Sequence, residues 1–199
     1  MTNPHPPSSS SSSSSTTTSL LLSSVDSSNP SDHLEDMRFG RFVIPKASIF
    51  SRTALSAAFV NLRPIVPGHV LIMPQRIVPL MADLTTEEYT DMWLLVRQVQ
   101  GMLQRHYNAT AFNVAVQDGR AAGQSVPHVH VHILPRTEGD FQRNDDIYEA
   151  LEEWAPRIDM VKERTSIDVP DDKDRVDRTL EMMAEEAATY RRLLEQSTR

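Results

Sequence analysis

Three histidines occupy every second position in the stretch from Gln124 to Arg136; they are His128, His130 and His132. A neutral imidazole can bind a metal ion, transfer a proton or attack phosphorus as a nucleophile. Branched apolar residues fill the positions between the histidines, and this alternation is typical of a β-strand. Residues two apart on a strand share a face, so the sequence predicts three imidazoles on one side of a strand.

The histidines alone permit three interpretations. The first is a metal site, in which a His-x-His pair binds zinc and His69 or an acidic residue completes the three or four ligands. The second is nucleophilic catalysis, in which one imidazole forms a phosphoramidate with a substrate phosphorus. The third is a structural role in the core, which is disfavoured because burying three imidazoles without partners is costly.

The turn in front of the histidines favours the phosphate chemistry. Residues 121–126 are mostly small, so their backbone N–H groups can approach a ligand, and Gln124 and Ser125 add an amide and a hydroxyl. Such donors suit the oxygens of a transferring phosphoryl group. The neighbouring sequence places no acid on the histidine face that could orient a zinc ligand.

Two pairs of strands are expected to position the histidines. Strands are predicted at 39–44, 49–50, 55–60 and 69–73, with a two-proline turn at 61–68 between the last two. A further strand at 112–117 precedes a turn at 118–123 and then the histidine strand, so these two strands form an antiparallel pair. Gln117 then lies at the loop end, on the histidine face.

Residues 85–107 carry the clearest helix pattern. Residues 85–88 fit a capping box, in which Thr85 and Glu88 satisfy each other's backbone N–H groups. Apolar residues then recur at helical spacing, namely Tyr89, Met92, Trp93, Val96, Val99, Leu103 and Tyr107. A short helix is expected at 147–154 and a final helix at 174–195. Strands grouped around one long helix predict an α+β fold with a largely antiparallel sheet.

Composition divides the chain into four segments. Residues 1–36 form a Ser/Thr-rich tail, predicted to be disordered because the unbroken serine run Ser8 to Ser15 offers little apolar area. A folded domain spans 37–155. A polar stretch without periodicity, 156–173, is predicted to be a mobile linker, and 174–199 holds the C-terminal helix.

Charge and composition exclude several function classes. The formal net charge of −7 argues against binding to nucleic acid or to an anionic membrane surface. No apolar run approaches the roughly 18 residues that span a bilayer. The absence of cysteine excludes disulfides and thiolate metal sites.

Residues His128 to Leu134 resemble the histidine-triad motif, His-φ-His-φ-His-φ-φ with φ apolar. Further matching stretches are Phe39-Gly40, Leu55 to Asn61, Pro67 to Leu71, Gln117 to Gly119, Ala122 to Gln124, Gly139 to Phe141, Arg143 to Asp145 and Ile147-Tyr148. Together they resemble the fragile-histidine-triad branch of the histidine triad (HIT) family over about residues 38–154. The nucleoside-phosphoramidase branch instead carries Gly-Gly-Arg where this chain has Leu134-Pro135-Arg136.

The resemblance implies a HIT-like fold and a hydrolase that cleaves diadenosine triphosphate to AMP and ADP. In that scheme His130 attacks the α-phosphorus and carries the nucleotidyl group, while His132 contacts the phosphate and protonates the leaving group. His128 supports the ring of His130 or contacts His69. The remaining implied substrate-binding residues are Asn61 at the ribose, His69, Gln117 at the phosphate, and Gly123, Gln124, Ser125 and Val126 along the phosphates.

The resemblance also implies a divalent cation, Mg²⁺ or Mn²⁺, that travels with the polyphosphate, and no metal held by the protein. It implies a homodimer formed through the long helix and an extended sheet, and a cytoplasmic location with the nucleus as a second compartment. Two alternatives stay open: a nucleoside phosphoramidase, and a signalling protein whose nucleotide-bound form is active and whose turnover is slow.

Overall fold

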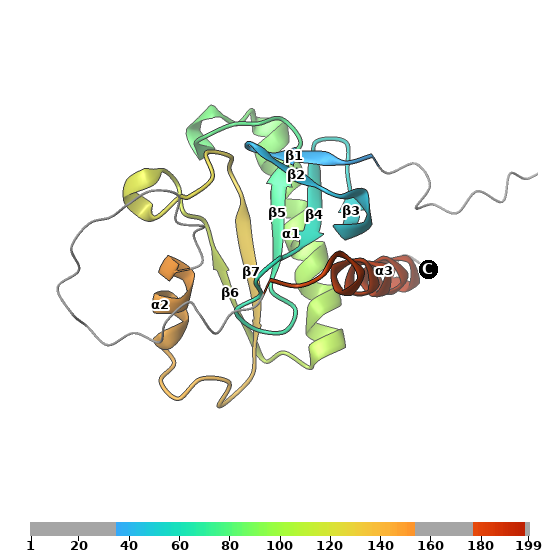
Figure 1. Ribbon diagram of the computed structural model, residues 1–199, viewed down its shortest axis with the longest axis vertical. Coiled ribbons are helices and arrows are strands. Elements are labelled where there is room, and N and C mark those ends of the chain that lie inside the picture. The colour runs from blue at the N-terminus through green and yellow to red at the C-terminus, as the bar shows by residue number, and fades with distance from the viewer. Residues whose placement is uncertain (1–34, 154–176, 198–199) are drawn as a thin grey trace, which may run out of the picture. The chain divides into compact units, whose positions relative to one another are not determined.

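Antiparallel strand pairing organises the protein, whose computed structural model describes residues 35–153 and 177–197 (Figure 1). The elements are β1 (Met37–Phe39), β2 (Phe42–Ile44), η2 (Lys46–Ser48), β3 (Ile49–Arg52), β4 (Ser56–Val60), β5 (Val70–Pro74), η3 (Met81–Asp83), α1 (Thr86–Tyr107), β6 (Ala111–Ala115), η4 (Arg120–Ala122), β7 (Val131–Arg136), α2 (Asp146–Glu153) and α3 (Leu180–Ser197). The predicted linker and residues 1–34 of the predicted tail lie outside the described residues.

The main sheet has five strands in the order β3-β4-β5-β7-β6, and each neighbouring pair is antiparallel. The predicted pairing across the 61–68 turn is confirmed in β4 and β5. The predicted pairing of 112–117 with the histidine strand is confirmed in β6 and β7. The α+β class with a largely antiparallel sheet is therefore correct.

One prediction about the histidine strand is wrong, because β7 begins at Val131 and not at His128. The N–H of Val129 bonds to the carbonyl of Val78 at 2.7 Å, and the N–H of His128 bonds to that of Val126 at 2.7 Å. These bonds use loop partners in place of a neighbouring strand. His128 and His130 therefore lie in the loop that precedes the ladder.

Helix α1 covers one face of the sheet, and its predicted capping box is present at Thr85 and Glu88. The buried residues of α1 pack against sheet residues such as Val131 and Ile133, which point away from the histidines. The predicted apolar stripe is wrong at Tyr89, which is 46% exposed; the buried stripe runs instead through Leu95 and Met102.

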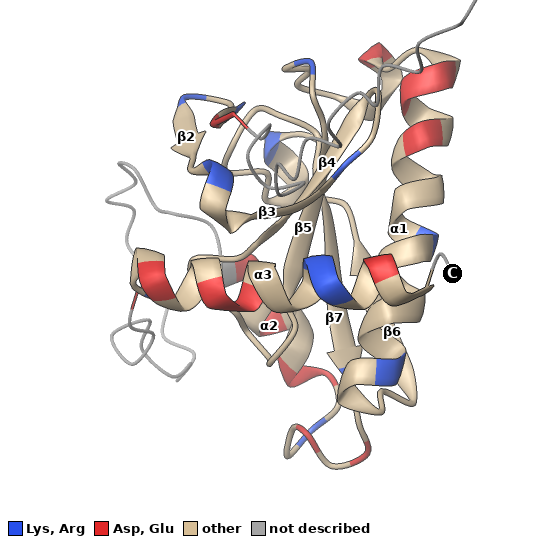
Figure 2. Ribbon diagram, turned by 90° about the vertical axis from the view of Figure 1, so that its right-hand side faces the viewer, with Lys and Arg blue, Asp and Glu red and all other residues tan. Residues whose placement is uncertain are grey.

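Helix α3 lies across the sheet beside α1 (Figure 2). It begins at Leu180, so the predicted start at 174 is wrong for the described residues 177–179, which are not helical. The reason is that the N–H of Arg178 bonds to the carbonyl of Leu62. On α3, Met183, Ala187, Tyr190 and Leu194 are buried, whereas Leu180 is exposed. In the described parts of the chain, no helix has the length and apolar character needed to cross a bilayer.

The opposite face of the sheet carries the histidines. There the β1–β2 hairpin packs through Met37 and Phe39 onto Phe59, Leu71 and their neighbours. Helix α2, at the position of the predicted short helix, covers Leu134 through Ile147 and Leu151. Two small apolar clusters therefore flank the histidines on this face and exclude water from them.

Candidate active site

The three motif histidines and His69 are all buried, with at most 1% of any of them exposed. The ring centroids of His130 and His132 lie 5.0 Å apart, and those of His132 and His69 lie 5.2 Å apart. Phe39 meets His130 edge-on at 4.9 Å and lies 5.6 Å from His128. The imidazoles predicted to share a face are therefore assembled into one site.

His130 has the protonation state of a nucleophile. Its Nδ1 lies 2.7 Å from the carbonyl oxygen of His128, and because a carbonyl only accepts, Nδ1 carries the proton. The lone pair of the neutral ring is then on Nε2. Burial lowers the pKa of His130 to about 4, so the ring is neutral at neutral pH.

His132 has the opposite tautomer. The N–H of Ile65 donates to Nδ1 of His69 at 3.2 Å, so the proton of neutral His69 is on Nε2. That Nε2 lies 3.0 Å from Nδ1 of His132, which must accept. His132 therefore carries its proton on Nε2. Burial, together with the neighbouring His130 and His69, holds the pKa of His132 well below its usual value.

Main-chain groups fix the ring of His128, and the carbonyl of His128 supports His130. Its Nδ1 accepts from the N–H of Gly40 at 3.2 Å, and its Nε2 donates to the carbonyl of Pro74 at 2.9 Å. Both ring nitrogens are thus engaged by the main chain, and burial lowers the pKa of the ring. The predicted support of His130 is correct, and it comes from the His128 carbonyl. The ring bonded to His69 is that of His132, so the predicted alternative contact between His128 and His69 is not the one formed.

His128 is not available as a ligand in the metal interpretation, because both of its ring nitrogens are hydrogen-bonded to the main chain. Over residues 35–153 and 177–197, no group of three or more His, Cys, Asp or Glu side chains is arranged to hold a metal.

Gln117 and Gly123 are close together in the turn before the histidines. The β6–β7 register ends where Ala115 lies opposite His132, and Gln117 follows two residues beyond β6, with its amide nitrogen donating to the carbonyl of Leu151 on α2 at 3.4 Å. The φ of Gly123 is +87°, and a Cβ there would lie 2.8 Å from Nε2 of Gln117. The left-handed backbone favours glycine at 123, and a Cβ there would displace the Gln117 amide.

The three residues after Gly123 have different environments. The amide nitrogen of Gln124 donates to the carbonyl of Pro79 at 2.7 Å, so that group holds the turn in place. Ser125 Oγ is buried and has no hydrogen-bond partner among the described residues. Val126 is 2% exposed and packs in the apolar cluster of the β1–β2 hairpin. Of these, Ser125 is the side chain best suited to receive a phosphate oxygen.

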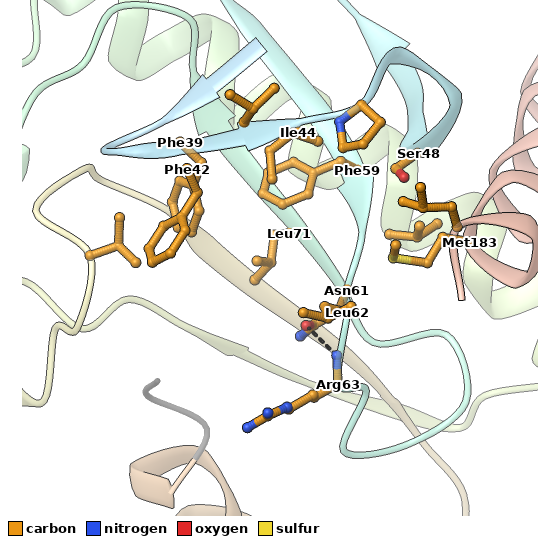
Figure 3. A pocket seen from close by; sticks show the side chains of 15 residues that line it. Phe39, Phe42, Ile44, Ser48, Phe59, Asn61, Leu62, Arg63, Leu71 and Met183 are labelled. Atoms are coloured by element: carbon orange, nitrogen blue, oxygen red, sulfur yellow. Dashed lines mark hydrogen bonds between the residues drawn. The ribbon is translucent and has the colours of Figure 1, made fainter. Parts of the chain in front are cut away.

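A pocket of about 370 Å³ opens on the same face (Figure 3). Its walls are mainly apolar, and its lining residues include Phe39, Phe42, Ile44, Phe59, Leu71 and Asn61. The Oδ1 atom of Asn61 accepts from the N–H of Arg63 at 3.1 Å, which directs its amide nitrogen toward His69 at 3.2 Å. A flat aromatic group fits such a pocket, with polar atoms at one end.

Phe39 joins this pocket to the nucleophile, since it lines the pocket and contacts His130. Sequence reasoning did not assign Phe39 to the site, although it lies in a stretch that matches the family. Nor did it assign the backbone groups of Gly40, Ile65 and Pro74. Those groups act through N–H and C=O, which every sequence position offers, so no residue pattern marks them.

An antiparallel sheet with buried neutral histidines beside an aromatic pocket defines the class of histidine-triad proteins. The HIT domain family model matches residues 42–139. The bifunctional bis(5'-adenosyl)-triphosphatase/adenylylsulfatase FHIT of Arabidopsis thaliana is 47% identical, over 79% of this chain and 83% of the relative. The asymmetrical bis(5'-nucleosyl)-tetraphosphatase of Schizosaccharomyces pombe is 45% identical, over 77% of this chain and 91% of the relative.

Among solved structures, a diadenosine triphosphate hydrolase of Plasmodium falciparum in complex with cyclomarin A has a TM-score of 0.62 and 30% identity, covering 81% of this chain and 86% of its own. The chain belongs to the histidine triad family. Within it, the named relatives confirm the fragile-histidine-triad branch that the sequence motifs predict.

Proposed function

We propose that this chain hydrolyses dinucleoside polyphosphates and cleaves diadenosine triphosphate to AMP and ADP through a covalent nucleotidyl-His130 intermediate. The observation that carries this proposal is the pair of opposite tautomers, a lone pair on Nε2 of His130 and a proton on Nε2 of His132. The printed activities of the relatives, a bis(5'-adenosyl)-triphosphatase and a bis(5'-nucleosyl)-tetraphosphatase, support the substrate class.

In the first step, Nε2 of His130 attacks the α-phosphorus. A P–N bond forms while the P–O bond to the departing ADP breaks. ADP leaves as its anion, and the leaving oxygen accepts a hydrogen bond from Nε2–H of His132. Burial aids this step because a neutral His130 needs no deprotonation before it attacks. The bond from Nδ1–H to the His128 carbonyl stabilises the positive charge that develops on the His130 ring.

In the second step, water attacks the same phosphorus and the P–N bond breaks, which releases AMP. The attacking water gives its proton to solvent, and the electron pair of the P–N bond returns to Nε2 of His130. The His69 ring holds Nδ1 of His132 as an acceptor in both steps, so Nε2–H of His132 remains a hydrogen-bond donor to the phosphate oxygens.

The aromatic pocket is the proposed nucleoside site, with the base against Phe39 and Phe59 and the ribose at Asn61. Phosphate oxygens would then lie near Gly123 and Ser125 in the turn before the histidines, beside the amide of Gln117. Val126 closes the apolar wall, and Gln124 anchors the turn.

Three further proposals follow the family resemblance. A divalent cation, Mg²⁺ or Mn²⁺, accompanies the polyphosphate as part of the substrate, and the histidines hold no metal of their own. Two copies of the chain form a homodimer, and β6, an outer strand of the five-stranded sheet, offers an edge for an extended sheet. The proposed location is cytoplasmic, and nuclear as a second compartment.

The test of the hydrolase is His130→Asn, which removes the nucleophilic nitrogen. Turnover of diadenosine triphosphate should fall by roughly four orders of magnitude, while nucleotide binding persists. The matched control is His106→Asn on the exposed side of α1, which should keep wild-type turnover. Near-wild-type turnover in His130→Asn would overturn the proposal. A higher rate on an adenosine phosphoramidate than on diadenosine triphosphate would instead indicate a phosphoramidase.

A further inference from the structure

Two residues in front of α3 hold the chain where it leaves β4. The guanidinium of Arg178 donates two hydrogen bonds to the backbone carbonyl of Asn61, one of them from Nε at 3.0 Å. The N–H of Arg178 donates to the carbonyl of Leu62 at 3.2 Å. The carboxylate of Asp177 pairs with the guanidinium of Arg63. The β4–β5 ladder ends at the Val60–Val70 pair. The contacts of Arg178 therefore hold the backbone at Asn61, one residue beyond the ladder.

Arg178 is itself fixed by neighbours on α3. It forms an ion pair with Glu186, and the two side chains are only 14% and 16% exposed. The other carboxylate oxygen of Glu186 accepts from the hydroxyl of Tyr190, which lies 2.6 Å from that of Tyr107 on α1. The guanidinium of Arg178 thus bonds to the Asn61 carbonyl and to the Glu186 carboxylate, and it holds these acceptors in a defined geometry.

Helix α3 also contributes directly to the aromatic pocket. Leu180 and Met183 are among the lining residues, and Figure 3 shows Met183 beside Ser48 at the end away from Arg63. Arg191 donates to the carbonyls of Ala47 and Ile49, on either side of Ser48, at 2.7 and 3.0 Å. The family model ends at residue 139, so this wall of the pocket lies outside the matched domain.

We propose that Arg178 is a positioning residue for the nucleoside, because it fixes the backbone of Asn61 at the edge of the pocket. The carbonyl of Asn61 is held by Arg178, and its side chain faces His69. Loss of Arg178 frees the backbone at 61 and thereby the direction of the Asn61 amide. That the ligand is a nucleoside rests on the proposed function. The contacts of Arg178 and α3 with the pocket do not depend on it.

The test is Arg178→Ala in the full chain, with the affinity for AMP measured by titration calorimetry and the steady-state constants measured with diadenosine triphosphate. AMP affinity should fall, and KM should rise, by about tenfold, which corresponds to about 1.4 kcal/mol. kcat should change far less, because Arg178 reaches neither His130 nor His132. The control Arg192→Ala removes an exposed arginine of the same helix that bonds only to Thr189 in the described structure, and it should bind AMP as the wild type does.

A combined substitution separates positioning from a general loss of structure. If Arg178 acts through the Asn61 side chain, then Asn61→Ala with Arg178→Ala should bind AMP no more weakly than Asn61→Ala alone. Additive losses in the double variant, or unchanged AMP affinity in Arg178→Ala, would overturn the proposal. Should Arg178→Ala lose its cooperative melting transition, Glu186→Gln keeps Arg178 but removes its charge partner, and AMP affinity should still fall.

The two proposals fail separately. A wild-type chain that binds AMP and hydrolyses no dinucleotide refutes the hydrolase, and AMP affinity of the variants still decides the role of Arg178. A wild-type chain that hydrolyses diadenosine triphosphate, with Arg178→Ala equal to it in KM, refutes the role of Arg178 alone.

Discussion

The burial of His130 predicts how stability depends on pH. His130 is 1% exposed, and burial lowers its pKa to about 4, whereas an imidazole in the unfolded chain has a pKa of about 6.5. Between these two values the unfolded chain binds more protons than the folded chain. The contribution of neutral His130 is therefore complete above about pH 6.5 and is lost as the pH falls toward 4.

The size of the effect follows from these two pKa values. One pH unit corresponds to about 1.4 kcal/mol per proton, so lowering the pH from 7 to 5 should remove about 2 kcal/mol of stability through His130. His128 and His132, whose pKa values are also lowered by burial, add to the loss in the same direction. Glu88 and Asp140, whose pKa values are lowered chiefly by arginine partners, lose their contribution only below about pH 4.5.

The assay is urea unfolding at pH 7 and pH 5. Asn at position 130 does not titrate, so His130→Asn should lose about 2 kcal/mol less than the wild type over this interval. The exposed His106→Asn variant is the matched His-to-Asn substitution outside the site. Equal losses in wild type and His130→Asn would refute the claim that His130 is buried in its neutral form.

Two other substitutions test the site. His69→Phe removes the donor to Nδ1 of His132, so kcat should fall about 100-fold, with partial recovery in His69→Gln. An unchanged kcat of His69→Phe in steady-state assays would contradict the assigned tautomers. Gly123→Ala places a Cβ 2.8 Å from Nε2 of Gln117, and it should lower both kcat and the melting temperature, with about 1–2 kcal/mol of backbone strain. Gly139→Ala, at φ +78° with open space around its Cβ, should show the strain alone, so equal kcat in both variants would count against Gln117.

Features that depend on nearby residues could be predicted from the sequence. The capping box at Thr85 and Glu88 closes within one helical turn, so its four residues sufficed to place the start of α1. The alternation of residues 112–117 likewise gave the faces of β6, since Val114 packs against the core while Ala115 lies opposite His132. In both cases the partners are adjacent or follow one local period.

Features set by distant partners could not be predicted in this way. The alternation at His128 to His130 is indistinguishable from that of the strand that follows, yet the N–H of Val129 bonds to Val78 and the ladder begins only at Val131. The start of α3 similarly depends on Arg178 reaching the carbonyls of Asn61 and Leu62. Periodicity indicates an extended or helical backbone, whereas the partner decides where the regular element begins.

The motif alone left the roles of its histidines open because their tautomers depend on hydrogen-bond partners. His130 and His132 have nearly identical neighbours, but one has its Nδ1 against a carbonyl and the other against the Nε2–H of His69. The tautomer of His69 depends in turn on the N–H of Ile65, in the two-proline turn at 61–68. The two roles are thus distinguished by backbone groups, the His128 carbonyl within the motif and the Ile65 N–H outside it. A chain could retain all three histidines and still lose the proposed chemistry if this turn no longer directed the Ile65 N–H at His69.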